Sequence, residues 1–352
     1  MTPFQPHWFL SGAGEDRMFR PMKPTSTFSL TLCATLLTGS LHFAHAADAL
    51  TAGQPLALAG THGRFDFLTI DADGRRLLAA HTGNNSLDVI DLDKAELVKA
   101  VPTGAAQSAA VDAKAKRYYV AVSNPPQMAI VDAAKLEVIG KVPLSGPADL
   151  MAFNAKNGLA YVGHDDAKEV WVIDPMAKKI TAAIALAGEG PEDIVFDATE
   201  ARAFQAVKTK NSIAVVDTAT NQVHTHWPTA PLEGPHGMAL AANVDALLVA
   251  GSNARLALLS LKDGHVIASA EIAKGVDQMA YDAGLHRAYC ACSSGKISVY
   301  QVDKDKLTSL GDVTSPQGAR SVAVDQKTHT VWIAYAKGDA SFVQPFTTTA
   351  AK

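Results

Sequence analysis

The sequence predicts an all-β protein, a seven-bladed β-propeller with four antiparallel strands in each blade. Three observations support this prediction. Short apolar runs end on a polar residue at a regular period, each period holds four such runs, and an apolar run near the N-terminus matches the fourth run of a later copy. Because a small four-stranded sheet cannot bury both of its faces alone, successive copies are expected to pack against one another around a ring.

The repeat is clearest where the third apolar run of each copy ends. The steps between these positions are 41, 42, 43, 43, 41 and 43 residues, a length that suits four short strands with their turns. The aligned residues are Asp91, Asp132, Asp174, Asp217, Ser260, Gln301 and Gln344. We interpret the aspartates as turn residues rather than catalytic ones, since a carboxylate at a strand end accepts N–H groups from the turn that follows.

The runs themselves have the composition of strands. In the second copy they are SAAVD, RYYVA, MAIVD and VIGKV, rich in β-branched and aromatic residues and separated by short polar stretches. No segment keeps apolar residues at helical spacing over three turns. The elements of every copy are therefore predicted to be strands.

The two ends of the chain predict how the ring closes. After Gln344 only eight residues remain, too few for a turn and a full fourth strand. The run QPLALAG at 54–60 resembles AAIALAG at 182–188, which is the fourth strand of the third copy with its exit. We predict that residues 54–60 form the outer strand of the last blade and cover an otherwise exposed sheet edge.

The N-terminal segment is expected to be a leader that is removed. Residues 1–46 contain Lys23, an apolar stretch from Phe28 to Leu37 and a small-residue pattern at 44–46. Together these features are typical of a secretory signal peptide cleaved after Ala46. An N-terminal anchor is the alternative, although the apolar stretch is too short to span a bilayer.

The mature chain, residues 47–352, is predicted to be a single propeller domain and a monomer, periplasmic or secreted. The natural start of such a signal would be Met22 or Met18. The full chain has a formal net charge of −4, and the mature chain one of −5. Because proteins that bind phosphate backbones are usually basic, nucleic acid is an unfavoured partner. No membrane span is expected after signal cleavage.

The mature chain keeps two cysteines, Cys290 and Cys292. Two residues apart on a strand, their thiols share one face without reaching easy disulfide geometry. We interpret them as small core residues rather than as a redox or metal pair.

Several segments resemble a known family. They are YYVAVSN at 118–124, AYVGHDD at 160–166, the VID and VVD strand ends, and the Gly-Pro pairs at 146–147, 190–191 and 234–235. Over about residues 51–346 the chain resembles the YVTN-repeat β-propeller family, the YncE-like exported proteins. This resemblance implies the fold and export. DNA binding has been attached to the family, and the negative net charge argues against it here.

The polar residues near the starts of the first strands together predict one binding site. The innermost strands of a propeller line its central channel, and five residues before the end of each one the sequence holds a polar residue. We predict a mixed-charge pocket for a small polar ligand or a cation at the channel mouth. In blade four the position is ambiguous between Glu192 and Asp193. The predicted ligand-binding residues are Asp66, Gln107, Asp149, Glu192, His236, Asp277 and Arg320.

Four histidines, His62, His81, His164 and His236, are candidate metal ligands. Of these, His81 and His164 occupy matching places in copies one and three, in a second ring ten residues beyond the first-strand ends. Neutral imidazoles bind metals, and nearby carboxylates can complete such a site. A divalent metal ion is thus a possible cofactor, and no other cofactor is predicted.

The sequence favours a binding or scaffold protein over an enzyme, with a small polar ligand or a periplasmic protein as its partner. The first alternative is a metal-dependent, lactonase-like hydrolase that would use Asp66, Asp149, Asp277 and His236. The second is an accessory protein for haem or copper that would use His81 and His164. The chain contains no C-x-x-C-H, H-E-x-x-H or G-x-S-x-G motif, so a c-type cytochrome, a zincin and a serine hydrolase are disfavoured.

Overall fold

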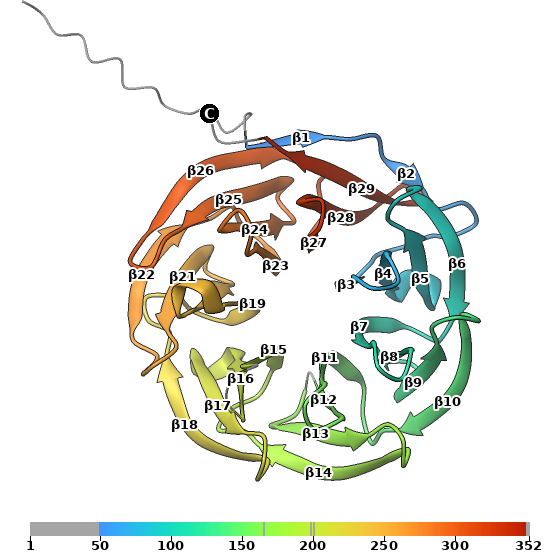
Figure 1. Cartoon of the computed structure of the whole chain (residues 1–352), viewed down its shortest axis with the longest axis horizontal. Coiled ribbons are helices and arrows are strands. Elements are labelled where there is room, and N and C mark those ends of the chain that lie inside the picture. The colour runs from blue at the N-terminus through green and yellow to red at the C-terminus, as the bar shows by residue number, and fades with distance from the viewer. Residues whose placement is uncertain (1–48, 165, 198, 200, 350–352) are drawn as a thin grey trace, which may run out of the picture. The chain divides into compact units, whose positions relative to one another are not determined.

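The computed structural model describes residues 49–164, 166–197, 199 and 201–349, and these form seven small antiparallel sheets in a ring (Figure 1). The leader and its cleavage site lie outside the described residues. Within the described residues, the helical segments are three 3₁₀ turns: η2 (Thr82–Asn84), η3 (Lys208–Lys210) and η4 (Ala242–Val244). None of the described helices is long and apolar enough to cross a membrane. The predicted seven-bladed β-propeller is confirmed.

The blades follow the chain, and in each one the first strand is innermost. Blade one is β3 (Leu68–Asp71), β4 (Arg76–His81), β5 (Ser86–Asp91) and β6 (Glu96–Pro102); blade two is β7 (Ala106–Asp112), β8 (Arg117–Val122), β9 (Gln127–Asp132) and β10 (Glu137–Pro143). Blade three is β11 (Ala148–Asn154), β12 (Leu159–His164), β13 (Glu169–Asp174) and β14 (Lys179–Ala185); blade four is β15 (Pro191–Asp197), β16 (Arg202–Val207), β17 (Ser212–Asp217) and β18 (Gln222–Pro228). Blade five is β19 (Pro235–Ala241), β20 (Ala246–Gly251), β21 (Arg255–Ser260) and β22 (Val266–Glu271); blade six is β23 (Val276–Asp282), β24 (Arg287–Cys292), β25 (Lys296–Val302) and β26 (Leu307–Thr314). Blade seven is β27 (Ser321–Asp325), β28 (Thr330–Lys337) and β29 (Ala340–Thr348), completed by β1 (Leu50–Ala52) and β2 (Leu56–Ala57).

The hydrophobic core is divided among the spaces between blades. Adjacent residues of a middle strand point to opposite faces of the sheet, so both faces must be covered. Leu78 packs with Tyr118 of blade two, while its neighbour Leu77 packs with Trp332 of blade seven. This arrangement explains the nearly continuous apolar runs in the sequence, because a strand buried on both faces loses the polar alternation.

Ring closure occurs where the sequence predicted it. Leu56 pairs with Val343, and the backbone N–H of Leu58 donates to the carbonyl of Ser341 at 2.9 Å. The strand also begins earlier than predicted, since residues 50–52 pair with 346–348 (Figure 1). Gly53 still donates its backbone N–H to the Pro345 carbonyl at 2.8 Å, and the pairing is interrupted between it and Leu56.

The aspartates at the ends of the third strands hold the turns, as predicted. The Asp174 carboxylate accepts the backbone N–H groups of Met176 at 2.9 Å and Ala177 at 2.8 Å. The same pair of hydrogen bonds recurs at Asp91, Asp132 and Asp217.

The two cysteines are core residues, as the sequence indicated. Cys290 and Cys292 are free, fully buried and part of the cluster between blades five and six. Burial raises the pKa of the Cys292 thiol to about 12, so this sulfur is held in its neutral form.

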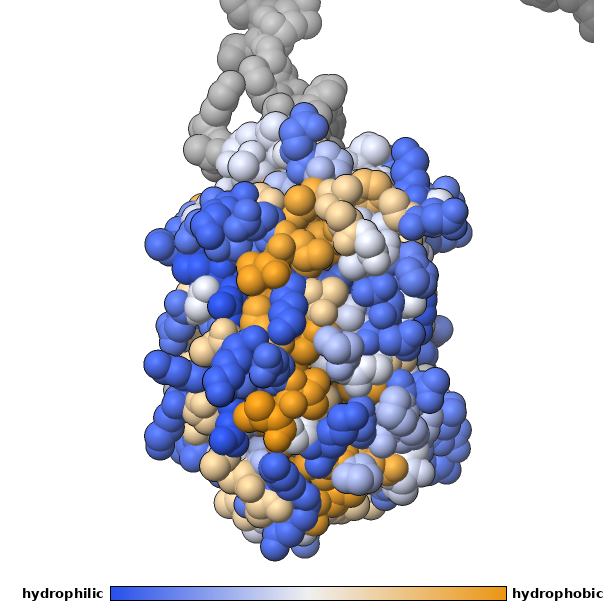
Figure 2. Space-filling view, turned by 90° about the vertical axis from the view of Figure 1, so that its right-hand side faces the viewer, coloured by the Kyte–Doolittle hydropathy of each residue, from blue (hydrophilic) through white to orange (hydrophobic). Residues whose placement is uncertain are grey.

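The outer strands form the rim. Figure 2 shows apolar residues in a band along this rim, between polar flanks. Val98 in β6, Ile139 in β10 and Ile180 in β14 are exposed, and the first two occupy the same bulged position of their blades. Single exposed apolar residues are common on soluble proteins, and these three have no assigned role here.

On the face opposite the channel mouth, side chains link neighbouring blades. The two terminal nitrogens of Arg75 in blade one donate to the two carboxylate oxygens of Asp325 in blade seven, each at 2.8 Å. The hydroxyl of Tyr118 in blade two donates to Asp71 of blade one at 2.7 Å. These bonds fix the angle between blades at the ends of the innermost strands.

Removal of one such bond is expected to have a moderate effect. Tyr118→Phe should lower the free energy of unfolding by about 1–2 kcal/mol, because it leaves a buried oxygen of Asp71 without this donor. Urea denaturation of the variant measures this loss. Tyr335→Phe is the matched control, since the Tyr335 hydroxyl makes no hydrogen bond to the described residues, and it should change stability by less than about 0.5 kcal/mol. Equal effects of the two changes would contradict the interpretation.

Candidate functional site

A cavity of about 250 Å³ lies where the innermost strands begin, at one end of the central channel. All seven predicted residues line it, and each stands at or just before the first residues of an innermost strand. In blade four, Glu192 lines this cavity, whereas Asp193 lines a second one farther along the channel. That the seven residues bind a ligand stays a prediction. The lining comprises Arg64, Asp66, Phe67, Gln107, Ser123, Pro147, Ala148, Asp149, Leu150, Glu192, Lys208, His236, Asp277 and Arg320.

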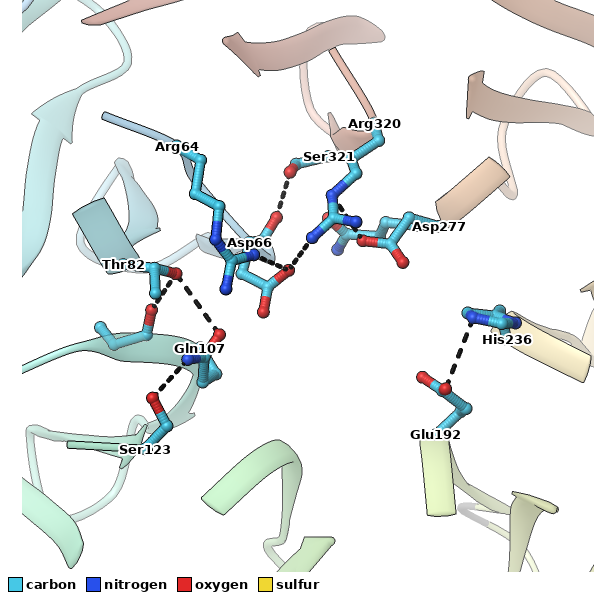
Figure 3. Close-up of polar contacts among 12 residues, drawn as sticks. Arg64, Asp66, Thr82, Gln107, Ser123, Glu192, His236, Asp277, Arg320 and Ser321 are labelled. Atoms are coloured by element: carbon cyan, nitrogen blue, oxygen red, sulfur yellow. Dashed lines mark hydrogen bonds and ion pairs between the residues drawn. The ribbon is translucent and has the colours of Figure 1, made fainter. Parts of the chain in front are cut away.

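Arg320 lies between two carboxylates from the blades on either side of it (Figure 3). Its Nη2 is 3.0 Å from Oδ1 of Asp66 in blade one, and its Nε is 3.2 Å from Oδ2 of Asp277 in blade six. Arg64 approaches the same oxygen of Asp66 at 3.8 Å. This group of four charges therefore joins blades six, seven and one at the ring closure.

A second charged group lies across the cavity (Figure 3). Glu192 Oε1 accepts a hydrogen bond from Lys208 Nζ at 2.8 Å and lies 3.4 Å from His236 Nε2. The other ring nitrogen of His236 is 2.9 Å from the carbonyl oxygen of Gly234, which fixes the orientation of the ring.

Uncharged polar groups of blade two line the wall between these two charged groups, and the Asp149 carboxylate of blade three also lines it. The amide nitrogen of Gln107 donates to the Ser123 hydroxyl at 2.5 Å, and Thr82 approaches the Gln107 amide oxygen at 3.4 Å. The Gln107 amide is thus held by hydrogen bonds while its side chain lines the cavity.

Two carboxyl groups of the channel have strongly raised pKa values. Burial, with the negative charge of Asp277 as the second cause, raises the pKa of Asp66 to about 7, although Arg320 and Arg64 act in the opposite direction. Burial also raises the pKa of Asp193 to about 7. Its oxygens accept hydrogen bonds from the backbone N–H groups of Met238 and Ile194, which lower this pKa but do not offset the burial. Near neutral pH, the charge of the channel therefore depends on pH.

The four candidate metal-binding histidines are not brought together. His236 lines the cavity, whereas His62 is exposed beside a separate pocket near the closing strand. His164 stacks on Trp171, with 5.0 Å between ring centroids.

His81 is fully buried and takes part in the packing of blade one against blade seven. Its Nδ1 lies 2.7 Å from Asp88, and its Nε2 lies 3.1 Å from both the Gly63 carbonyl oxygen and the Ser341 hydroxyl. The ring also stacks on Phe65. Both ring nitrogens are therefore engaged in contacts within the fold.

The donor set does not fit a divalent cation at the acidic end of the cavity. Among the described residues, no three His, Cys, Asp or Glu side chains have the grouping of metal ligands. The Arg320 guanidinium lies between Asp66 and Asp277, where a bound cation would meet a positive charge already paired with both carboxylates. The lactonase alternative needs that position for its metal, so it gains no support from this geometry.

Sequence reasoning missed Arg64, Ser123 and Lys208. Ser123 and Lys208 directly follow Val122 and Val207, the second-ring residues of their copies, which are buried between blades. A count to the first polar residue after each second strand would have found Ser123 and Lys208. Arg64 lies two residues before Asp66, at a place where no other copy has a charged residue, so the repeat gives no signal for it.

Comparisons with known proteins identify the fold. The chain is similar to the solved structure of a Kuenenia stuttgartiensis hydrazine synthase chain, with a TM-score of 0.69 and 14% identity over 84% of this chain and 99% of that one. It is also similar to the WD40 repeats of RRP9, with a TM-score of 0.73 and 10% identity over 85% and 99% of the two chains. A structure of U3-55K gives a TM-score of 0.73 and 10% identity, over 84% of this chain and 99% of that one.

No family model and no curated protein matches the sequence, so the resemblance to the YVTN-repeat family stays a prediction. At these identities the likeness is one of fold alone: the chain is a seven-bladed β-propeller.

Proposed function

We propose that this chain is an exported β-propeller that binds a small polar ligand in the cavity at the mouth of its central channel. The observation that supports this most is the convergence of fixed, charged and neutral polar groups from several blades on one cavity. Small-ligand sites are concave and hold a few polar groups in defined orientations. The ion pairs and hydrogen bonds between these side chains hold them in place before any ligand arrives.

The cavity size favours a small ligand over a protein segment as its occupant. A volume of about 250 Å³ lies slightly below the range of drug-sized pockets. A protein partner would have to use the faces or the rim of the ring instead. We therefore take the small polar ligand as the primary partner.

A cavity-filling variant tests the site. Ser123→Trp should fill the space beside Gln107 without removing a charge, and Ser252→Trp, at the equivalent place in blade five outside the cavity lining, is its control. Thermal unfolding is followed while small organic acids, amines, zwitterions and polyols are added separately. A compound that raises the midpoint in the native chain and in Ser252→Trp, but not in Ser123→Trp, supports the proposal. Stabilisation that is unchanged in Ser123→Trp would contradict this binding site.

Export is tested on the full-length chain expressed in a Gram-negative cell. The periplasmic fraction should contain a protein whose first residue is Ala47, as determined by intact mass and N-terminal peptides. Replacement of Ala44 and Ala46 by leucine should block processing, because the cleavage site needs small residues. A full-length protein retained in the cytoplasm would contradict export while leaving the cavity proposal untouched.

A further inference from the structure

The charged groups of the cavity are arranged in two levels. The side chains of Arg64, Lys208 and Arg320 keep 57%, 40% and 36% of their surface exposed. Their carboxylate partners are deeper, with Asp66 at 10%, Glu192 at 8% and Asp277 at 17%. A molecule entering from solvent therefore meets these cationic groups first. The acids paired with them lie deeper and offset the cost of removing the cations from water.

The cations form two groups on different sides of the ring. Arg64 and Arg320 belong to blades one and seven, on the far side of the cavity from Glu192 of blade four (Figure 3). Lys208 pairs with Glu192. The wall between them holds the neutral donors of Gln107 and Ser123 in blade two and the half-buried carboxylate of Asp149 in blade three. A ligand that spans the cavity would contact positive charge at each end, with the uncharged donors of blade two along its body.

The arginines have donors left for a ligand. The closest contacts of Arg320 with its two carboxylates use Nε and Nη2, and its Nη1 donates no hydrogen bond to the described residues. The guanidinium of Arg64 makes only the 3.8 Å ion pair with Asp66 among the described residues. A planar fork of N–H groups is the geometry that binds carboxylates through two parallel hydrogen bonds.

We propose, building on the binding function proposed above, that the ligand is a small α,ω-dicarboxylate. One carboxylate is bound by Arg64 and Arg320, and the other is bound by Lys208 on the opposite side of the cavity. The same surface selects against diamines, because an ammonium group entering the mouth would meet the exposed cations before any acid.

The protonation of Asp66 then makes binding depend on pH. The groups that face this carboxyl are Arg64, Arg320, Asp277 and Glu192. Below pH 7 Asp66 is largely protonated, and above pH 7 it adds a negative charge beside the bound carboxylate. We expect dicarboxylate affinity to fall by about three- to tenfold between pH 6 and pH 8. Asp66→Asn should remove this dependence and retain high affinity at pH 8.

The test is calorimetric titration of the mature protein with four compounds that share a four-carbon chain. Succinate carries two carboxylates, 4-aminobutyrate one of each charge, 1,4-diaminobutane two ammonium groups, and 1,4-butanediol none. Glutarate and adipate extend the dicarboxylate series. We expect a dicarboxylate to bind at least about tenfold more tightly than 4-aminobutyrate, with no binding of the diamine or the diol.

Variants locate the bound carboxylates. Arg64→Gln and Lys208→Gln should each weaken dicarboxylate binding by about tenfold or more, because each removes a charged donor. Arg255→Gln is the matched control, since Arg255 also makes a single long ion pair, 3.9 Å to Glu271, away from the cavity. It should leave the affinity unchanged.

The possible failures are distinguishable. Binding of the diamine, the diol or the zwitterion in preference to the dicarboxylates, with loss in Ser123→Trp, would overturn the dicarboxylate and leave the binding function standing. Dicarboxylate binding that persists in Arg64→Gln and Lys208→Gln would overturn the assigned positions. Absence of binding for every compound at millimolar concentration would overturn the dicarboxylate and count against the proposed function as well.

Discussion

Deletion of residues 49–58 from the mature chain is expected to lower the free energy of unfolding by about 6 kcal/mol, the largest effect predicted for this protein. The segment supplies the outer strand of blade seven and is its link to the start of the ring. Leu50 is buried at 3% exposure in the core between blades six and seven, and Leu58 at 2% exposure in the core between blades seven and one. Loss of a buried leucine costs about 3 kcal/mol, and a domain has only about 5–15 kcal/mol of stability in total.

Point variants separate packing from strand pairing. Leu50→Ala and Leu58→Ala should each cost about 3 kcal/mol, whereas Thr51→Ala, an exposed residue of the same strand, should cost less than about 0.5 kcal/mol. Urea denaturation followed by circular dichroism gives these values. The deleted protein should also associate, because the edge of β29 is uncovered. A deletion variant that stays monomeric with the midpoint of the intact chain would show that the ring does not need this strand.

The fold could be predicted because its information is local and repeated. Asp174 and its counterparts mark strand ends every 41 to 43 residues, and four strands per repeat leave few ways to bury both faces. The closing strand was predictable for the same reason, since residues 54–60 carry the pattern of a fourth strand. The earlier pairing at Leu50 was not, because residues 53–55 lie outside the strands and separate Leu50 from the run that carries the pattern.

The residues that line the cavity could be predicted, but the ion pairs and hydrogen bonds between them could not. Counting from the first-strand ends gave seven residues that all line one cavity, because the innermost strands share one register. The ion pairs join blades that are adjacent in space and distant in sequence: Arg320 and Asp66 are 254 residues apart. His81 shows the same limit, since its contact with Ser341 spans 260 residues and depends on ring closure. No repeat-based count predicts that Arg320 occupies the space between two acids.

Arg320→Ala should be the most damaging single change at the channel mouth, lowering the free energy of unfolding by about 2–3 kcal/mol at pH 8. Breaking a fully buried ion pair by removing one partner costs about 3–5 kcal/mol, and the 36% exposure of the Arg320 side chain reduces this through solvent screening. The cost arises because Asp66 and Asp277 are left as two negative charges without the cation between them.

The pH dependence of this effect identifies its cause. The pKa of Asp66, already raised to about 7 by burial and Asp277, should rise further without Arg320. Because the folded chain then holds a proton that the unfolded chain releases above its ordinary pKa of 3.8, stability falls as pH rises through this interval. The penalty of Arg320→Ala should therefore be smaller at pH 5, where Asp66 is protonated, than at pH 8. Urea denaturation at the two pH values measures the difference.

Neutralising the partners provides the control. In a double variant with Asp66→Asn and Asp277→Asn, Arg320→Met should lower the free energy of unfolding much less than it does in the native chain. The reason is that no carboxylate is left unpaired in the double variant. In the native chain, Arg320→Lys should give a free energy of unfolding between those of the native protein and Arg320→Met. An ammonium keeps the charge but cannot contact both acids with a planar fork. An equal cost for loss of Arg320 at both pH values and in both backgrounds would mean that its packing, and not its charge, joins blades six, seven and one. The two-level arrangement of charge on which the dicarboxylate site depends would then lose its electrostatic basis.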